Sequence, residues 1–128
     1  MTYSKIMLAS ASLFGALAFF LIAAPEVIFL LFGLPGSDDA TVMSNRAAAL
    51  FVGLAALSWF GRSVRTNEAK VLTLKSLIAT MGSLIAVGVF HAVTKQVGFG
   101  VAVALVGEGL FLMAYLNCLK SAKDGRSV

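Results

Sequence analysis

Long apolar stretches separated by short polar links dominate the chain. Crossing about 30 Å of hydrocarbon at about 1.5 Å per residue takes roughly 20 helical residues. Four stretches reach that length, at residues 6–24, 42–61, 71–92 and 97–116. Because the links are short, consecutive spans should lie antiparallel. The pattern predicts an all-α polytopic membrane protein, an antiparallel bundle of four transmembrane helices that forms a single domain over residues 1–128.

A further apolar segment, residues 25–33, follows the first span and is too short to cross the bilayer alone. Pro25 suits a first helical position, Glu26 complements the positive end of a helix dipole, and Gly33 signals a helix end. These signals fit a short separate helix on the outer face. They fit equally well one long first helix that is kinked at Pro25.

The basic residues are divided unequally between the two faces of the predicted bundle. Two of the ten lie on one face, Arg46 and Lys95. The other face carries Lys5, Arg62, Arg65, Lys70, Lys75, Lys120, Lys123 and Arg126. Since cytoplasmic loops are enriched in lysine and arginine, both termini should be cytoplasmic in a plasma (inner) membrane. Residues 6–24 are longer than a signal-peptide core, so we expect them to be retained as the first span.

The composition also indicates an integral membrane protein. The chain is 59% hydrophobic and 12% charged, against roughly 45–50% and 25% in soluble domains. The net charge of +4 does not indicate nucleic-acid binding, because the basic residues sit at the ends of apolar segments and form no continuous stripe. Cys118 is the only cysteine, which excludes an internal disulfide.

Small residues recur at four-residue spacing, which lets helix backbones approach closely in a membrane. The pairs are Ala11 with Gly15, Ala49 with Gly53, Gly82 with Ala86, and Gly100 with Ala104. We expect these positions to form packing seams within the bundle, with one seam available to a partner subunit or to a second copy.

Glu108 is the principal candidate for function. It lies between two glycines, roughly 16 Å into the span that begins at Val97, and therefore near the bilayer midplane. Its helix face also carries Gly100 and Ala104, so the side chain should face another helix. Arg46 is roughly 10 Å away along the helix axis, too far for a direct ion pair.

Two interpretations of Glu108 stay open. In the first, slightly favoured one, the carboxyl is neutral and hydrogen-bonds another helix, since hydrocarbon disfavours the charged form. Hydroxyl groups at a similar depth are the expected neighbours, from Ser12, Thr80 and Ser83. Tyr115, seven residues further on, lies on nearly the same helix face as Glu108 and is a further possible neighbour. In the second, Glu108 exchanges a proton, binds a ligand or meets a partner protein.

A second polar group is predicted near the outer ends of the helices, comprising Glu26, Arg46 and His91. Their similar depth favours a structural role in which Arg46 pairs with Glu26. A metal site has little support, because the chain has a single histidine and no metal-ligand motif.

Catalytic signatures are missing from the sequence: it has no GxSxG elbow, no Walker loop and no dinucleotide fingerprint. Cys118 and His91 belong to opposite membrane faces, which excludes a cysteine–histidine pair. We therefore expect neither an enzyme nor a cofactor.

In size, span count and lone membrane carboxylate, the chain is similar to the small multidrug resistance transporters. That family carries its glutamate in the first helix, whereas the first span here has no acidic residue before Glu26. The sequence assigns the chain to no characterised family.

Three function classes follow, in order of preference. The first is a non-catalytic accessory or structural subunit that docks on a larger membrane complex through its small-residue faces and Glu108. The second is a small oligomeric proton-coupled transporter or channel that uses Glu108. The least favoured is an enzyme that acts on lipid or quinone, because acid, base and nucleophile candidates are so few.

Overall fold

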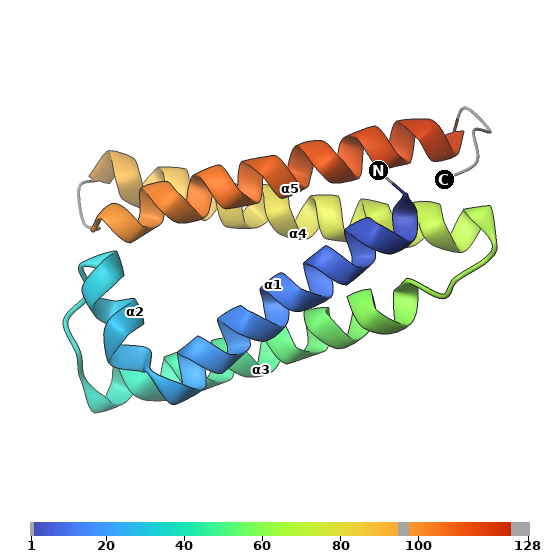
Figure 1. Ribbon diagram of the computed structural model, residues 1–128. Helices are drawn as coiled ribbons and strands as arrows, with labels where there is room; N and C mark the ends of the chain where they lie inside the picture. Colours follow the sequence, from blue (N-terminus) through green and yellow to red (C-terminus); the bar gives the residue numbers. More distant parts are fainter. Residues whose placement is uncertain (1, 95–97, 124–128) are drawn as a thin grey trace.

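The computed structural model describes residues 2–94 and 98–123, which form helices and no strand. The helices are α1 (Tyr3–Ala23), α2 (Pro25–Phe32), α3 (Asp38–Gly61), α4 (Asn67–Thr94) and α5 (Phe99–Lys123) (Figure 1). Helices α1, α3, α4 and α5 are long and apolar enough to cross a membrane. The predicted all-α architecture with four membrane-spanning helices is thus confirmed. The predicted start of the last span, Val97, lies outside the described residues, as do Lys95 and Arg126.

Helix α2 is separate from α1. At Ala24 the backbone leaves the helical region (φ −148°, ψ 58°), and Pro25 begins the new helix. The helix ends at Gly33, whose φ of 68° lies in the left-handed region that glycine adopts without strain. The backbone N–H of Leu34 then donates to the carbonyl of Phe29, at 2.8 Å. Of the two alternatives for this segment, the short separate helix is correct.

The spanning helices form two antiparallel pairs, α1 with α3 and α4 with α5. Figure 1 shows α1 crossing obliquely, so that its beginning lies against the α4–α5 pair and its end lies on α3. At the other end of the bundle, α2 lies between the end of α1 and the start of α5 (Figure 1). We call the half that contains the beginning of α1 and the end of α5 the terminal half, and the opposite half the α2 half.

Most of the hydrophobic core belongs to the terminal half. Its largest fully buried side chains include Tyr3, Phe14, Leu74, Leu77 and Tyr115, which come from α1, α4 and α5. The hydroxyl of Tyr3 also donates to the carbonyl of Gly61, at 3.1 Å, which ties the beginning of α1 to the end of α3.

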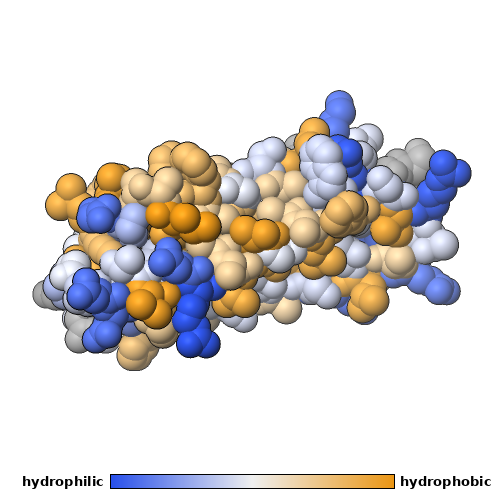
Figure 2. Space-filling model, turned by 90° about the horizontal axis from the view of Figure 1, so that it is seen from below, coloured by the Kyte–Doolittle hydropathy of each residue, from blue (hydrophilic) through white to orange (hydrophobic). Residues whose placement is uncertain are grey.

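The outer surface of the helices is largely apolar. Large hydrophobic side chains such as Leu30, Phe60 and Phe99 are at least 74% exposed. Figure 2 shows apolar side chains along the middle of the visible face and hydrophilic ones gathered toward the two ends. Such a surface is matched to hydrocarbon between two aqueous boundaries.

Candidate functional site

The end of α2 is fixed to the start of α5 by a contact between backbones. The backbone N–H of Gly98 donates to the carbonyl of Phe32, at 2.7 Å. A Cβ atom would come within 2.6 Å of the Leu31 carbonyl oxygen if placed on Gly98, and within 2.7 Å if placed on Gly100. Glycine is therefore required at both positions for this close approach. Gly100, expected at a packing seam, lies in this contact.

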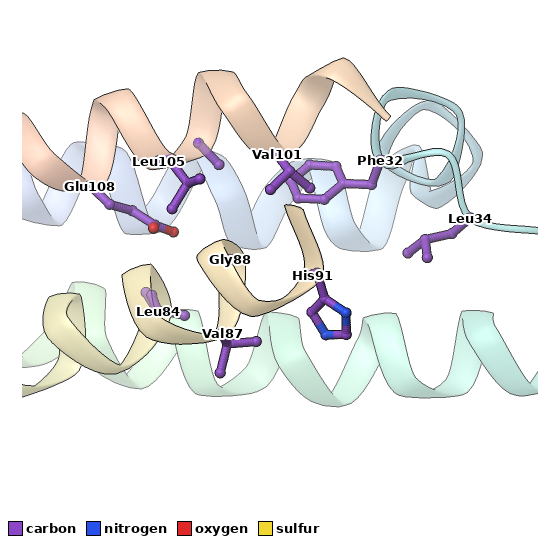
Figure 3. Close-up of a pocket in the computed structure, with 10 residues that line it drawn as sticks. Phe32, Leu34, Leu84, Val87, Gly88, His91, Val101, Leu105 and Glu108 are labelled. Atoms are coloured by element: carbon purple, nitrogen blue, oxygen red, sulfur yellow. The ribbon is translucent and has the colours of Figure 1, made fainter. Parts of the chain in front are cut away.

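Next to this contact, a groove of about 330 Å³ runs between α4 and α5. We call it the α4–α5 groove. Phe32 and Leu34 border its outer end, while Leu84, Val87, Val101 and Leu105 supply most of its apolar walls (Figure 3). Two titratable side chains, Glu108 and His91, also belong to the lining. Its volume lies at the lower end of the range of about 300–1,000 Å³ that is typical of small-molecule sites.

Glu108 lies at the deep end of the α4–α5 groove. It follows Phe99, the first residue of α5, by nine positions, which places it roughly 14 Å along the helix. Its side chain is half-buried and points toward the groove (Figure 3). In residues 2–94 and 98–123, no side chain hydrogen-bonds or ion-pairs with this carboxyl. The interhelical hydrogen bond favoured from the sequence is thus not formed within the described chain.

The four hydroxyl groups expected near Glu108 bond elsewhere or lie on another face. They belong to Ser12, Thr80, Ser83 and Tyr115. The Tyr115 hydroxyl shares a 2.6 Å hydrogen bond with Ser10, in the terminal half. The hydroxyls of Thr80 and Ser83 each donate to a carbonyl one turn earlier in α4. Ser12 is exposed and lies beside residues of α3. Sequence spacing gives the depth and helix face of these groups but does not say which helices pair, so it also missed Ser10 as the partner of Tyr115.

The predicted outer polar group is not brought together. Glu26 and Arg46 are exposed on α2 and α3, and no ion pair joins them in the described structure. His91 instead lines the α4–α5 groove with Glu108. Because Gly88 packs on Leu105, antiparallel pairing puts His91 roughly 9 Å nearer the α2 end than Glu108. The residues described include no cluster of three metal-ligating side chains.

The other predicted packing glycines are not in close contacts. A Cβ atom on Gly15, Gly53 or Gly82 would meet nothing within 4 Å. Gly88, which the sequence analysis did not single out, has the tighter environment, since a Cβ there would lie 2.8 Å from a methyl group of Leu105. Ala104 lines the groove. Gly15 on α1 and Gly53 on α3 thus have open space beside them, whereas Ala11 on α1 is buried.

The α4–α5 groove combines apolar walls with one carboxyl at its deep end and one imidazole at its outer end. Its lining holds no serine, cysteine or lysine that would act as a nucleophile. A carboxyl in such a place has the chemistry to bind a hydrogen-bond donor or a cation and to exchange a proton. The arrangement is suited to an amphipathic ligand with an apolar body.

Neither a known protein family, nor a curated protein, nor a solved structure matches this chain.

Proposed function

We propose that this chain is a small multi-pass protein of the plasma (inner) membrane that binds a lipophilic cation in the α4–α5 groove, in exchange for a proton on Glu108. Both termini are assigned to the cytoplasm. The observation that supports the site is the Glu108 carboxyl, which faces an apolar groove and has no protein partner among the described residues. We assign the chain no catalytic activity.

The exchange follows from the free energy of a charge in hydrocarbon. A charged side chain at the centre of a bilayer is unfavourable by about 2.5 kcal/mol or more, so the empty site holds Glu108 protonated. An entering ammonium group carries the same unfavourable free energy until it pairs with an anion. Transfer of the Glu108 proton to water, followed by pairing of carboxylate and ammonium, leaves the net charge of the groove unchanged. His91 lines the end of the groove nearest α2, along the path that the proton takes to water.

Binding of a matched pair of small molecules tests the proposal. We would measure saturable binding of 4-phenylbutylamine and of the neutral 4-phenylbutanol to the full chain in lipid nanodiscs. The amine should bind at least tenfold more tightly, about 1.4 kcal/mol, and should release one proton per site in an unbuffered solution. Glu108→Gln should lower the amine affinity to that of the alcohol. Glu26→Gln, which removes an exposed carboxyl outside the groove, is the control and should change nothing.

Two results would contradict the proposal. One is equal affinity of the wild-type chain for the amine and the alcohol, since the carboxyl would then contribute nothing. The other is unchanged amine binding, with proton release, in Glu108→Gln.

A second candidate is an accessory or structural subunit of a larger membrane complex, and the open glycine positions favour it. Gly15 on α1 and Gly53 on α3 have no close neighbours within the chain, and small residues are typical of helix–helix interfaces in membranes. Gly53→Ile should reduce co-purification of a partner subunit from native membranes, whereas Val52→Ile, at an adjacent exposed position, should not. Recovery of the chain alone in mild detergent would eliminate this candidate.

The orientation is tested independently by cysteine labelling in intact cells, on a background without Cys118. Asp38→Cys should react with a reagent that cannot cross the membrane, and Lys120→Cys should not. The reverse pattern would overturn the assignment.

A further inference from the structure

A second crevice lies in the terminal half, where α1 crosses α5. Two adjoining cavities of about 350 and 190 Å³ share Ile6, Leu110 and Ala114 in their linings. We call them together the α1–α5 crevice. It is separate from the α4–α5 groove, with which it shares no lining residue.

The character of the crevice changes along its length. Toward the middle of the bundle its walls are apolar and include Ala9 and Phe111. Toward the end of α5 they include two polar side chains, Asn117 and Ser121. A molecule that fits this gradient has a hydrocarbon chain directed toward the bilayer centre and a polar group at the membrane boundary.

Helical spacing places one lysine of each wall beyond the lining residues at the polar end. Lys5 precedes Ala9 by four residues and therefore lies on the same face of α1, one turn nearer the helix beginning. Lys120 follows Asn117 by three residues on α5. Both lysines are exposed, and neither forms an ion pair within the described part of the chain.

We propose that the α1–α5 crevice binds one anionic phospholipid, with an acyl chain between α1 and α5 and its phosphate between Lys5 and Lys120. Asn117 and Ser121 hydrogen-bond the head group. The charge supports this occupant, because basic pockets between transmembrane helices on the cytoplasmic side are suited to anionic head groups, and the terminal end carries most of the basic residues. The site is independent of Glu108 and of the proposed amine binding.

Lipid retention tests the proposal. The full chain is reconstituted with equal amounts of phosphatidylglycerol and phosphatidylcholine, extracted in mild detergent and examined by native mass spectrometry. We expect at least fivefold enrichment of phosphatidylglycerol among retained lipids, with one bound per chain. The double variant Lys5→Gln/Lys120→Gln should lose the enrichment. Arg65→Gln/Lys75→Gln removes the same charge from exposed positions at the same end and should keep it.

A crevice variant separates head-group binding from chain binding. Ala114→Leu fills the space that both cavities share and should reduce retention of both lipids. Thermal unfolding of each variant shows whether it is folded. Both double variants should unfold at the same temperature as the wild type, because the side chains that they replace are exposed.

Three outcomes would overturn the proposal. The first is equal retention of the two lipids by the wild-type chain. The second is loss of the enrichment in the Arg65/Lys75 control as strongly as in the Lys5/Lys120 variant. The third is displacement of the lipid by millimolar glycerol phosphate, which would show that the anion alone is bound.

Discussion

The α1–α3 pair and the α4–α5 pair are held together by different contacts in the two halves of the bundle. In the terminal half, large side chains from α1, α4 and α5 pack directly on one another, and Phe14, Leu77 and Tyr115 are fully buried. In the α2 half a short helix is interposed, and its contact with α5 is a backbone contact at Gly98 and Gly100. Packed side chains join the helices in the terminal half, whereas a close backbone contact at two glycines joins them in the α2 half.

This difference explains why the α4–α5 groove lies in the α2 half. Close-packed side chains leave few voids larger than a water molecule, so the core around Phe14 and Tyr115 has no room for a ligand, and the α1–α5 crevice lies beside that core. Beside α2 the backbone contact holds the helices without filling the space between them, and the α4–α5 groove follows. Glu108 lies at the deep end of that space, facing it.

Truncation of a core phenylalanine should have the largest effect on stability. Phe14→Ala removes a fully buried side chain that stacks on Phe51, with ring centroids 6.0 Å apart. A loss of about 3–5 kcal/mol is expected from the lost contacts and the cavity left behind. Phe19→Ala is the matched control on the same helix, 65% exposed, and should have little effect. Equal losses in a denaturant titration of the two variants would contradict the assignment of the core to the terminal half.

A single methyl group at the α2–α5 contact should have the next largest effect. Gly98→Ala places a Cβ against the backbone of Leu31, where no flexible side chain is available to move. Overpacking of this kind destabilises by about 1–3 kcal/mol, and displacement of Phe32 should also weaken amine binding in the groove. Gly53→Ala, with nothing within 4 Å of its Cβ, should change neither. Wild-type stability and wild-type amine binding in Gly98→Ala would show that the α2–α5 backbone contact does not maintain the α4–α5 groove.

The hydrogen bond between Ser10 and Tyr115 should contribute less. Although it is short and buried, at 2.6 Å, hydrogen bonds between membrane helices average only about 0.6 kcal/mol in double-mutant cycles. A cycle of Ser10→Ala and Tyr115→Phe should give a coupling energy of that order. A coupling near zero would assign the burial of Tyr115 to packing alone.

The number and position of the spans could be predicted because the thickness of hydrocarbon sets a length that the sequence must match. The helices extend beyond the predicted apolar limits where polar residues cap them. For example, α3 begins at Asp38, and the Ser37 side chain accepts from the N–H of Ala40 at 3.1 Å. An apolar window starting at Val42 does not include such residues.

The depth of Glu108 could be predicted in the same way, but its surroundings could not. Helices that are apolar on nearly every face give little indication of which face meets which neighbour. Antiparallel order alone did not reveal that α1 pairs with α3, which moves Ser12 away from Glu108. His91 and Glu108 line the same groove because α4 and α5 approach closely at Gly88, and this contact between two helices could not be predicted from the sequence.

Replacement of Glu108 should have the smallest effect on stability, although it should have the largest effect on amine binding. Glu108 makes no hydrogen bond within the described chain, so Glu108→Gln removes no protein contact and should change the free energy of unfolding by less than about 0.5 kcal/mol. Infrared spectroscopy would follow the carboxyl directly: the wild-type chain should show the band of a protonated carboxyl that the variant lacks, and saturating 4-phenylbutylamine should convert it to a carboxylate band. Destabilisation of Glu108→Gln by more than 1 kcal/mol, with a carboxyl band that the amine leaves unchanged, would show that Glu108 serves the packing of the α2 half and that the α4–α5 groove is not an amine site.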